Sequence, residues 1–588
     1  MKKRINSYFL SAKVLLDYKI QTLIIFFVSV VSAVASGLSI GLLIPILEAD
    51  SRPLFSDTPF KYLDEFIKIF SGNSFNDRVL LVSILIIVLS SLELVMNLLS
   101  GILSAKTENQ IKKDYTFNVL DKLQKIEFTF FQNQTSGKLF TFLTTDPNIT
   151  SKIGKKILIT FQPAVLLIVY LSVMYTVSPI MTVLSLFFFV FISIISTSQI
   201  GNKIALSQKE ISTKLFYINS EVQETLDNFK NILSHGLLEQ QLKRLRNLFN
   251  EFFIINYKFQ RDTTFVIPIN NFVNSFGIAI LLIAGTIIFR EQDSSWTALL
   301  IPFLILLFKL LPAISQLNNL RVYLEANYIY IDRLNNFLQI DNFLIVQGDK
   351  PFNKLENQIE FKNVEFKYHN SKFLIKNFNL KIPANKTTAV IGVSGSGKTT
   401  MIDLLLKIYY PSEGQILFDD TDINLFKNST LRNKISYVSQ DTLFFNRSID
   451  ENLNLLNDTS KDFSDLFDKM NLSNFNKNKN QIIGSGGVNL SSGQKQKFNF
   501  IRAYLKEAEI LILDEPTSNL DFESQNILKN YLKEIEGTKT VIVVTHTASI
   551  LSICENVVVI EDGEIVQSGQ ISEIKNKSSY FREMLNGK

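Results

Sequence analysis

The chain has 588 residues, too many for one domain, and 46% of them are hydrophobic. The net charge is only +5 and no basic surface interleaved with aromatic residues is visible, so the composition argues against nucleic-acid binding. Cys554 is the one cysteine, which excludes a disulfide within the chain.

Six segments before residue 321 are long and apolar enough to cross a membrane as helices. Crossing about 30 Å of hydrocarbon takes about 20 apolar residues. The length and number of the segments together exclude a soluble core. Ser178-Pro179, between the third and fourth segments, predicts a tight hairpin. The segments are residues 21–48, 78–105, 157–178, 180–200, 264–289 and 296–320.

The basic N-terminus sets the predicted topology. Residues 8–18 are amphipathic and the first span is long, so we do not expect a cleaved signal. The positive-inside rule places the N-terminus in the cytoplasm. Loops 106–156 and 201–263 then lie inside, and loop 49–77 lies outside. We therefore expect a multi-pass protein of a bacterial inner (cytoplasmic) membrane, surrounded by membrane lipids.

A phosphate-binding loop lies at residues 392–400, GVSGSGKTT. It follows the apolar run 387–391, which predicts a strand, and precedes residues 401–406, which predict a helix. Glycines allow backbone N–H groups to point at phosphate oxygens, and the helix N-terminus adds partial positive charge. Lys398 is suited to reach the β- and γ-phosphates, and the Thr399 hydroxyl to hold Mg²⁺. An ordinary Gly-rich turn is the weak alternative.

Two carboxylates end a later apolar strand, residues 509–515. Asp514 is placed to bind Mg²⁺, and Glu515 to polarise an attacking water. A strand ending in Asp-Glu is common in α/β proteins and is weak evidence by itself.

Three further motifs accompany the carboxylates. Gln440 closes the predicted strand 435–439, the run Leu-Ser-Ser-Gly-Gln occupies residues 490–494, and His546 follows the apolar strand 541–544. With these motifs in this order, residues 355–588 resemble the ATP-binding cassette (ABC) superfamily, and the match is very specific.

The resemblance implies a role for each matching residue. Glu515 and His546 are expected to be catalytic, with a satisfied loop histidine as the alternative for His546. Tyr368 looks like the aromatic that stacks on adenine, although it is also compatible with a plain strand aromatic. Residues 490–494 look like the signature that caps a partner's ATP, and Asp521 like the dimer-contact loop. The expected Mg²⁺ ligands are Thr399, Gln440 and Asp514. The expected ATP-binding residues are Tyr368, Gly392, Ser394, Gly395, Ser396, Gly397, Lys398, Thr399, Thr400, Gln440, Ser491, Gly493 and Gln494.

The order of the segments resembles ABC half-exporters (type IV ABC transporters). This implies a multidomain fold: a six-helix α-helical transmembrane domain at 1–325, a linker at 326–354 and an α/β P-loop nucleotide-binding domain at 355–588. Residues 128–146 resemble the first coupling region of that family, and the second is expected around 212–226. The implied protein is an ATP hydrolase and translocase. One cassette per chain makes a homodimer the default, with both cassettes in the cytoplasm.

Two positions depart from the family pattern. Ser492 stands where the signature usually has a glycine, and its Cβ crowds a close approach to phosphate. Ser485 stands where exporters often carry an acidic residue. We expect the first departure to be tolerated and the second to affect coupling only.

Polar residues inside the spans are candidates for substrate contact, because they are costly in lipid. They are Glu93, Lys309 and the asparagines at 270, 271 and 274. Internal ion pairs or helix-to-helix hydrogen bonds are an equal alternative, and Glu93 with Lys309 is the expected pair.

Short segments resemble the lipid-linked oligosaccharide flippase branch of bacterial exporters. They are residues 39–46, 309–312 and the amphipathic outside segment 59–70. The resemblance implies ATP-driven translocation of an amphiphile, such as a lipid-linked oligosaccharide. A peptide or drug exporter is the alternative within the class, although Cys554 does not fit the appended cysteine peptidase of some peptide exporters. An ATP-gated channel or regulatory membrane protein is the alternative from another class.

Overall fold

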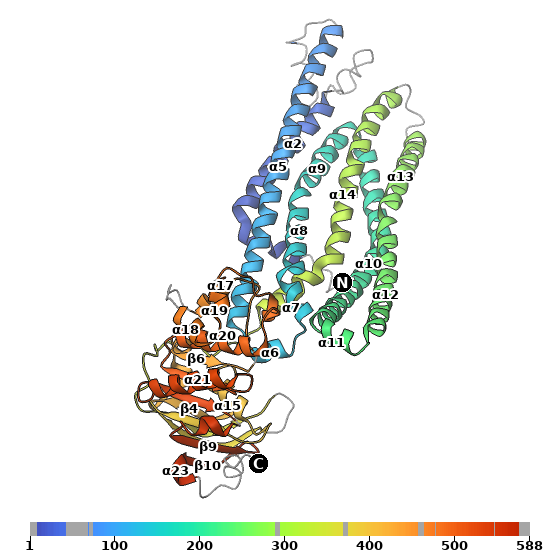
Figure 1. Ribbon diagram of the computed structural model, residues 1–588. Helices are drawn as coiled ribbons and strands as arrows, with labels where there is room; N and C mark the ends of the chain where they lie inside the picture. Colours follow the sequence, from blue (N-terminus) through green and yellow to red (C-terminus); the bar gives the residue numbers. More distant parts are fainter. Residues whose placement is uncertain are drawn as a thin grey trace. The chain divides into compact units, whose positions relative to one another are not determined.

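The computed structural model describes residues 9–42, 69, 75–288, 295–368, 374–440, 442–456, 464–476, 478–545 and 547–574. The chain divides into two compact units. Residues 1–126 and 130–343 form the helical membrane unit, and residues 127–129 and 344–588 form the cassette unit (Figure 1).

The membrane unit is built from long helices. By length and composition, four helical segments among the described residues could cross a membrane. The predicted fourth and fifth spans fall within α10 and α13, parts of whose side chains lie outside the described residues. The helices are η1 (Leu16–Tyr18), α2 (Lys19–Gly41), α5 (Phe75–Lys125), α6 (Phe128–Gln132), α7 (Ser136–Leu143), α8 (Thr145–Ile159), α9 (Phe161–Val177), α10 (Pro179–Asp227), α11 (Phe229–Ser234), α12 (Leu238–Thr264), α13 (Val266–Ile288) and α14 (Ser295–Leu338).

The segments predicted as long cytoplasmic loops are mostly helical. α5 continues through Lys125, and α10 continues through Asp227. No proline or glycine interrupts α5 between Ala105 and Lys125, so the hydrogen-bonded ladder continues beyond the apolar stretch. α14 likewise extends past residue 320 to Leu338. The amphipathic outside segment 59–70 lies outside the described residues, apart from Ile69.

Close packing holds the first span against the third. A Cβ added at Gly37 would collide with the Val169 side chain, so the glycine allows α2 and α9 to approach closely. Nearby, Ile40 and Tyr170 belong to one buried apolar cluster that also includes Leu307 of α14. Gly37 of the first span therefore serves close packing of two helices.

The cassette unit contains two sheets. A four-stranded antiparallel sheet has the order β2-β1-β4-β5, and a six-stranded sheet has the order β10-β9-β3-β8-β7-β6. In the second sheet all neighbours are parallel except β9 and β10. The strands are β1 (Gln358–Phe366), β2 (Ile375–Pro383), β3 (Thr387–Ile391), β4 (Glu413–Phe418), β5 (Thr421–Asp422), β6 (Ile435–Val438), β7 (Ile510–Asp514), β8 (Thr540–Val544), β9 (Asn556–Glu561) and β10 (Glu564–Gln570).

Helices cover the parallel sheet. The central strands β3, β7 and β8 are buried at every residue, as expected for parallel strands covered on both faces. Alternate residues join two different apolar clusters: Val541 and Val543 belong to one, and Ile542 and Val544 to the other. The helices are α15 (Lys398–Leu405), η2 (Ile423–Leu425), α16 (Asn428–Asn433), α17 (Ile449–Leu453), η3 (Asn454–Leu456), α18 (Ser464–Lys469), α19 (Ser473–Asn476), η4 (Ser485–Gly487), α20 (Ser492–Leu505), α21 (Phe522–Glu534), α22 (Ala548–Leu551) and α23 (Ile571–Ile574).

A short piece of the predicted first coupling region belongs to the cassette unit. Residues 127–129 group with this unit, and the Phe128 ring meets the Tyr409 ring edge-on, with centroids 5.9 Å apart. Tyr409 also packs against Phe366 and Tyr368. An aromatic cluster thus connects residues 127–129 to the end of β1, next to Tyr368.

Candidate functional site

The carboxyl ends of four parallel strands gather the nucleotide-site residues predicted from the sequence. The phosphate loop follows β3, Glu515 follows β7, and Gln440 follows β6. These strands are neighbours through β8, which lies between β3 and β7. Ligands of open α/β sheets bind at this edge. His546 follows β8 but is itself outside the described residues.

The phosphate loop is tightly folded around its backbone. A Cβ at Gly392 would meet the Ile560 carbonyl oxygen at 2.2 Å and the Ser396 hydroxyl at 2.7 Å, so only glycine fits. Gly395 and Gly397 have φ values of +82° and +107°, which favour glycine. Gly397 is the N-cap of α15, so the helix N-terminus opens directly from the loop.

Lys398 folds back over this loop. Its ammonium group donates to the carbonyl oxygens of Gly392 and Val393, at 2.9 Å each. Burial lowers its pKa, while the charges of Glu515 and Asp514 act in the opposite direction. The lysine therefore lies within electrostatic reach of both carboxylates.

The two carboxylates have different surroundings. Asp514 is buried and accepts a hydrogen bond from the Tyr437 hydroxyl at 3.3 Å. Glu515 is half-buried and accepts a long hydrogen bond of 3.4 Å from the side-chain amide of Gln440. The Glu515 backbone has a φ of +48°, and its N–H donates to the Val544 carbonyl oxygen at 2.9 Å. This geometry holds the carboxylate at the end of the strand.

The residues present fit ATP and Mg²⁺. The Ser396 hydroxyl is buried and has no hydrogen-bond partner among the described residues, so it is available to a phosphate oxygen. Thr399 and Gln440 are exposed, and with Asp514 they offer hard oxygen ligands. Mg²⁺ in phosphate sites takes one or two protein ligands together with phosphate oxygens and water.

Tyr368 lies beside the start of α15. Its hydroxyl is 3.2 Å from the Thr400 hydroxyl, and its ring meets Phe366 and Tyr409 edge-on. The ring remains half-buried. It is thus next to the phosphate loop, with part of its surface available to a base.

The signature residues open α20. Ser491 is the N-cap and forms a capping box with Gln494. A Cβ at Gly493 would meet the Asn519 carbonyl oxygen at 2.8 Å, so this glycine allows close packing. Ser492 is exposed, and its side chain is therefore free of this packing. Ser485 begins η4, and its side chain is outside the described residues.

Several supporting residues were not predicted from the sequence. The Gln496 amide donates to the Glu515 carbonyl oxygen at 3.0 Å and accepts from the Asn519 N–H. The Lys497 ammonium bonds the Asp521 carboxylate at 2.8 Å and holds its pKa well below the usual range. These contacts tie α20 to the loop after β7. The position of Gln496 and Lys497, just past the signature on α20, is the sequence feature from which these supporting roles could have been predicted.

Among the described residues, no ion pair joins Glu93 to Lys309, contrary to the expectation from their charges. Lys309 is exposed on α14, and Glu93 of α5 lies close enough to the Tyr170 hydroxyl of α9 for its charge to act there. The side chains of Asn270, Asn271 and Asn274 lie outside the described residues.

Glu93 is instead part of an intramembrane polar cluster. The Ser36 hydroxyl is 3.1 Å from the Tyr170 hydroxyl. One turn along α2, the Ser32 hydroxyl donates to the Asn97 side chain at 2.7 Å and accepts from the Gln162 amide at 3.1 Å. We call Ser32, Ser36, Glu93, Asn97, Gln162 and Tyr170 the polar cluster.

Comparison with known proteins agrees with this fold. Residues 22–310 match the family model described as the ABC transporter transmembrane region, and residues 375–518 match the model described as ABC transporter. The chain belongs to the ABC transporters and has the layout of a half-size type IV exporter. It is therefore a multi-pass membrane protein that binds ATP and hydrolyses it to drive transport.

Individual relatives cover most of the chain. The heterocyst differentiation ATP-binding protein HepA of Nostoc sp. is 26% identical over 95% of this chain and 92% of its own length. The ATP-dependent lipid A-core flippase of Salmonella typhimurium is 28% identical over 77% of this chain and 79% of its own length. A structure of a bacterial Atm1-family ABC exporter with ATP bound has a TM-score of 0.77 at 16% identity, covering 98% of this chain and 99% of that one. The last likeness shows the fold.

Replacing Lys398 with alanine is expected to weaken ATP binding by about ten- to a hundredfold, the range of one charge-assisted hydrogen bond. The reason is that its ammonium group lies on the phosphate loop, 2.9 Å from two loop carbonyl oxygens, where it can reach the phosphates. Among the described residues, no carboxylate is left without an ion-pair partner when the lysine is removed. Equilibrium binding of a fluorescent ATP analogue measures the change. An unchanged dissociation constant would remove Lys398 from the site.

Replacing Ser492 with glycine is expected to leave ATP hydrolysis equal or higher. The Ser492 side chain is exposed, and the capping box is made by Ser491 and Gln494. The cost is that of glycine in a first helical turn, below about 1 kcal/mol. A more than tenfold loss of steady-state ATPase activity, about 1.4 kcal/mol, would show that the Ser492 hydroxyl makes a needed contact.

Proposed function

We propose that two copies of this chain form a homodimer that uses ATP hydrolysis to move an amphiphile, such as a lipid-linked oligosaccharide, across a bacterial inner membrane. The observation that carries the proposal is the long alignment with lipid A-core flippases, which includes both the membrane region and the cassette. Those relatives are named for a lipid that bears sugars.

In this proposal each ATP lies on the phosphate loop of one copy and under the signature of the other. Lys398 binds the phosphates, and Thr399, Gln440 and Asp514 would hold Mg²⁺, whose charge would offset that of the phosphates. Glu515 orients and polarises the attacking water, and His546 contacts the γ-phosphate. Gln496 and Gly493 pack α20 closely against the loop after β7. This packing supports a rigid surface at the signature.

The polar cluster supports a substrate with a hydrogen-bonding head group. Its members come from α2, α5 and α9 and supply hydroxyl, amide and carboxylate groups at the depth of the spans. Polar groups are rare at this depth and usually face the interior of a bundle. Hydroxyl, amide and carboxylate groups are suited to the hydroxyls of a sugar.

ATPase stimulation in lipid nanodiscs tests the substrate class. We expect a lipid-linked oligosaccharide to stimulate hydrolysis by the wild-type protein and a hydrophobic peptide of similar size to have little effect. Glu515→Gln in the same nanodiscs is the control for contaminating ATPases. Stimulation by the peptide alone would favour a peptide exporter, and a constant rate with every amphiphile would favour a regulatory protein.

A further inference from the structure

A cavity of about 470 Å³ lies within the membrane unit, between α7, α10 and α14. Its α14 residues lie beyond residue 320, where the sixth predicted span ends, and so on the cytoplasmic side of the predicted topology. The volume falls in the range of small-molecule sites, about 300–1,000 Å³. The polar cluster does not contribute to its lining.

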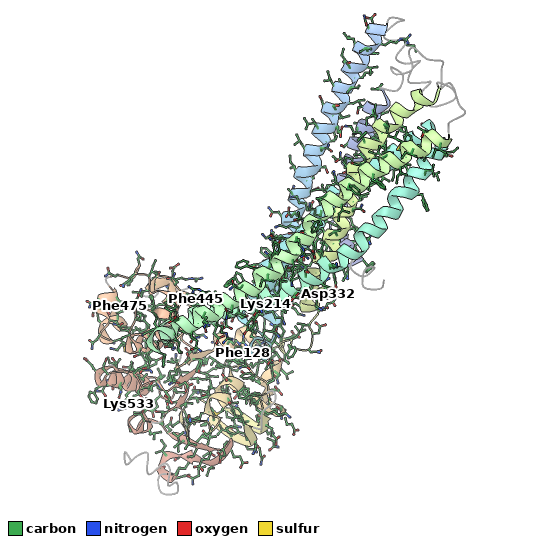
Figure 2. All side chains as sticks on the ribbon, turned by 90° about the vertical axis from the view of Figure 1, so that its right-hand side faces the viewer. Phe128, Lys214, Asp332, Phe445, Phe475 and Lys533 are labelled. Carbon is green, nitrogen blue, oxygen red and sulfur yellow. The ribbon has the colours of Figure 1, made fainter. Side chains whose placement is uncertain are left out.

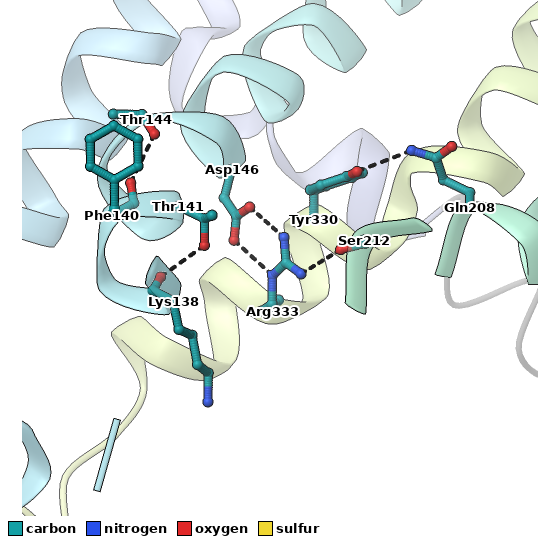
Figure 3. A network of polar contacts seen from close by, with 9 residues as sticks. All are labelled: Lys138, Phe140, Thr141, Thr144, Asp146, Gln208, Ser212, Tyr330 and Arg333. Carbon is teal, nitrogen blue, oxygen red and sulfur yellow. Dashed lines mark hydrogen bonds and ion pairs between the residues drawn. The ribbon is translucent and has the colours of Figure 1, made fainter. Parts of the chain in front are cut away.

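One wall of the cavity is a fixed guanidinium group. Arg333 of α14 donates two hydrogen bonds to the Asp146 carboxylate, at 2.8 and 2.5 Å, and one to the Ser212 hydroxyl at 2.7 Å (Figure 3). The guanidinium lies over the Phe216 ring, 4.2 Å from its centroid. Asp146 is fully buried. Asp146 therefore neutralises Arg333 and fixes its position.

Two lysines of the lining have no such partner. The Lys138 ammonium donates only to the neutral Gln134 side chain, at 2.6 Å, and the Arg333 charge repels it. Figure 3 shows the Lys138 side chain extending away from the Asp146 carboxylate. Lys209 is exposed on α10. Among the described residues, neither lysine has a carboxylate within ion-pair distance.

The cavity therefore has an excess of positive charge. Asp332, labelled in Figure 2, is the one carboxylate of the lining, and it accepts a long hydrogen bond from Asn336. Arg333 is already balanced by Asp146, so Asp332 offsets one of the two lysines. The rest of the lining includes the half-buried side chains of Phe216, Ile329 and Ile340, whereas Phe142 and Phe337 are buried in the core behind them. A cationic rim over an apolar wall suits an anion that carries an apolar group.

We propose that this cavity binds a soluble phosphate ester, with the phosphate at Lys138 and Lys209 and the organic group against Phe216 and Ile340. Ammonium groups bind phosphate through charge-assisted hydrogen bonds, and the lining keeps one positive charge after Asp332 offsets one lysine. Arg333 lies 13 residues past residue 320, about 20 Å along a helix, which is too far for the head group of a lipid in the bilayer. Because the three basic residues come from three helices, the ligand would favour one arrangement of α7, α10 and α14.

The test uses the full-length protein in phosphatidylcholine nanodiscs with phenyl phosphate as the probe. The phosphate loop is a competing site, so every variant carries Lys398→Ala. We expect ligand-observed NMR to show saturable binding of phenyl phosphate, tighter than binding of inorganic phosphate because of the apolar wall. Lys138→Gln combined with Lys209→Gln should weaken binding at least about tenfold. Lys203→Gln, an exposed lysine on the same helix as Lys209, is the matched control and should change nothing.

Lys209→Gln alone guards against a folding defect, because this side chain is exposed and unpaired; it should still weaken binding several-fold. Equal binding by the parent and the double variant, or no saturable binding by the parent, would overturn the proposal. If phosphatidic acid in the nanodiscs abolished the binding of phenyl phosphate, the ligand of this cavity would be a lipid head group and not a soluble ester.

Discussion

Replacing Glu515 with glutamine is expected to lower steady-state ATP hydrolysis by at least about a hundredfold, the smaller end of what a positioned general base contributes. Glutamine has the same shape, and the backbone at this position is fixed by the hydrogen bond from its N–H to Val544. ATP binding should persist, because it rests on the phosphate loop. Phosphate release and nucleotide binding, measured on the same preparation, separate the two effects.

The matched control is Glu564→Gln, an exposed glutamate on the edge strand β10. Its hydrolysis should equal that of the wild type. If Glu515→Gln also hydrolysed ATP at the wild-type rate, the carboxylate would not activate water and another group would have to be sought.

Replacing Asp146 with alanine is expected to destabilise the membrane unit by about 3–5 kcal/mol, as when one partner of a buried ion pair is removed. The Asp146 side chain has no exposed surface, and that of Arg333 is only 16% exposed. The substitution leaves a guanidinium group without its carboxylate among packed helices. The thermal midpoint of the purified protein, together with the yield of folded protein, measures the loss.

Asp341→Ala provides the comparison. It breaks the ion pair with Lys122, which has an N–O distance of 3.3 Å, but the Asp341 side chain is 78% exposed. Exposed pairs contribute about 0–1 kcal/mol. Arg333→Met added to Asp146→Ala should recover part of the lost stability, because it removes the unpaired charge. Equal thermal midpoints for Asp146→Ala and Asp341→Ala would show that the buried pair does not stabilise the unit.

The sequence was most informative where chemistry requires a local motif. The phosphate loop needs glycine at position 392 because a Cβ would collide with the Ile560 backbone, and that requirement is visible in the residue itself. The continuous apolar run of strands such as β8, which is buried at every residue, likewise predicts a covered parallel sheet. Parallel pairing then brings Gln440 and Glu515 to one edge, as the order of the motifs predicts.

Contacts between distant segments were not predictable in the same way. Asp146 and Arg333 are 187 residues apart, and neither lies in a motif that specifies a partner. Glu93 and Lys309 were matched by charge alone, and no ion pair joins them among the described residues, where Lys309 is exposed on α14. The extension of α5 through residues 106–125 is a local property, because no proline or glycine interrupts the helix after Ala105. Packing, which depends on the whole fold, decides the other two.

Reconstitution into sealed liposomes tests the central claim most directly. The measurement is ATP-dependent movement of a fluorescent lipid-linked oligosaccharide between leaflets, followed by loss of quenching from one side. The account predicts movement by the wild type with ATP and Mg²⁺, and none by Glu515→Gln or with ADP. Movement at the same rate without ATP, or ATP hydrolysis with no movement of any amphiphile, would contradict it.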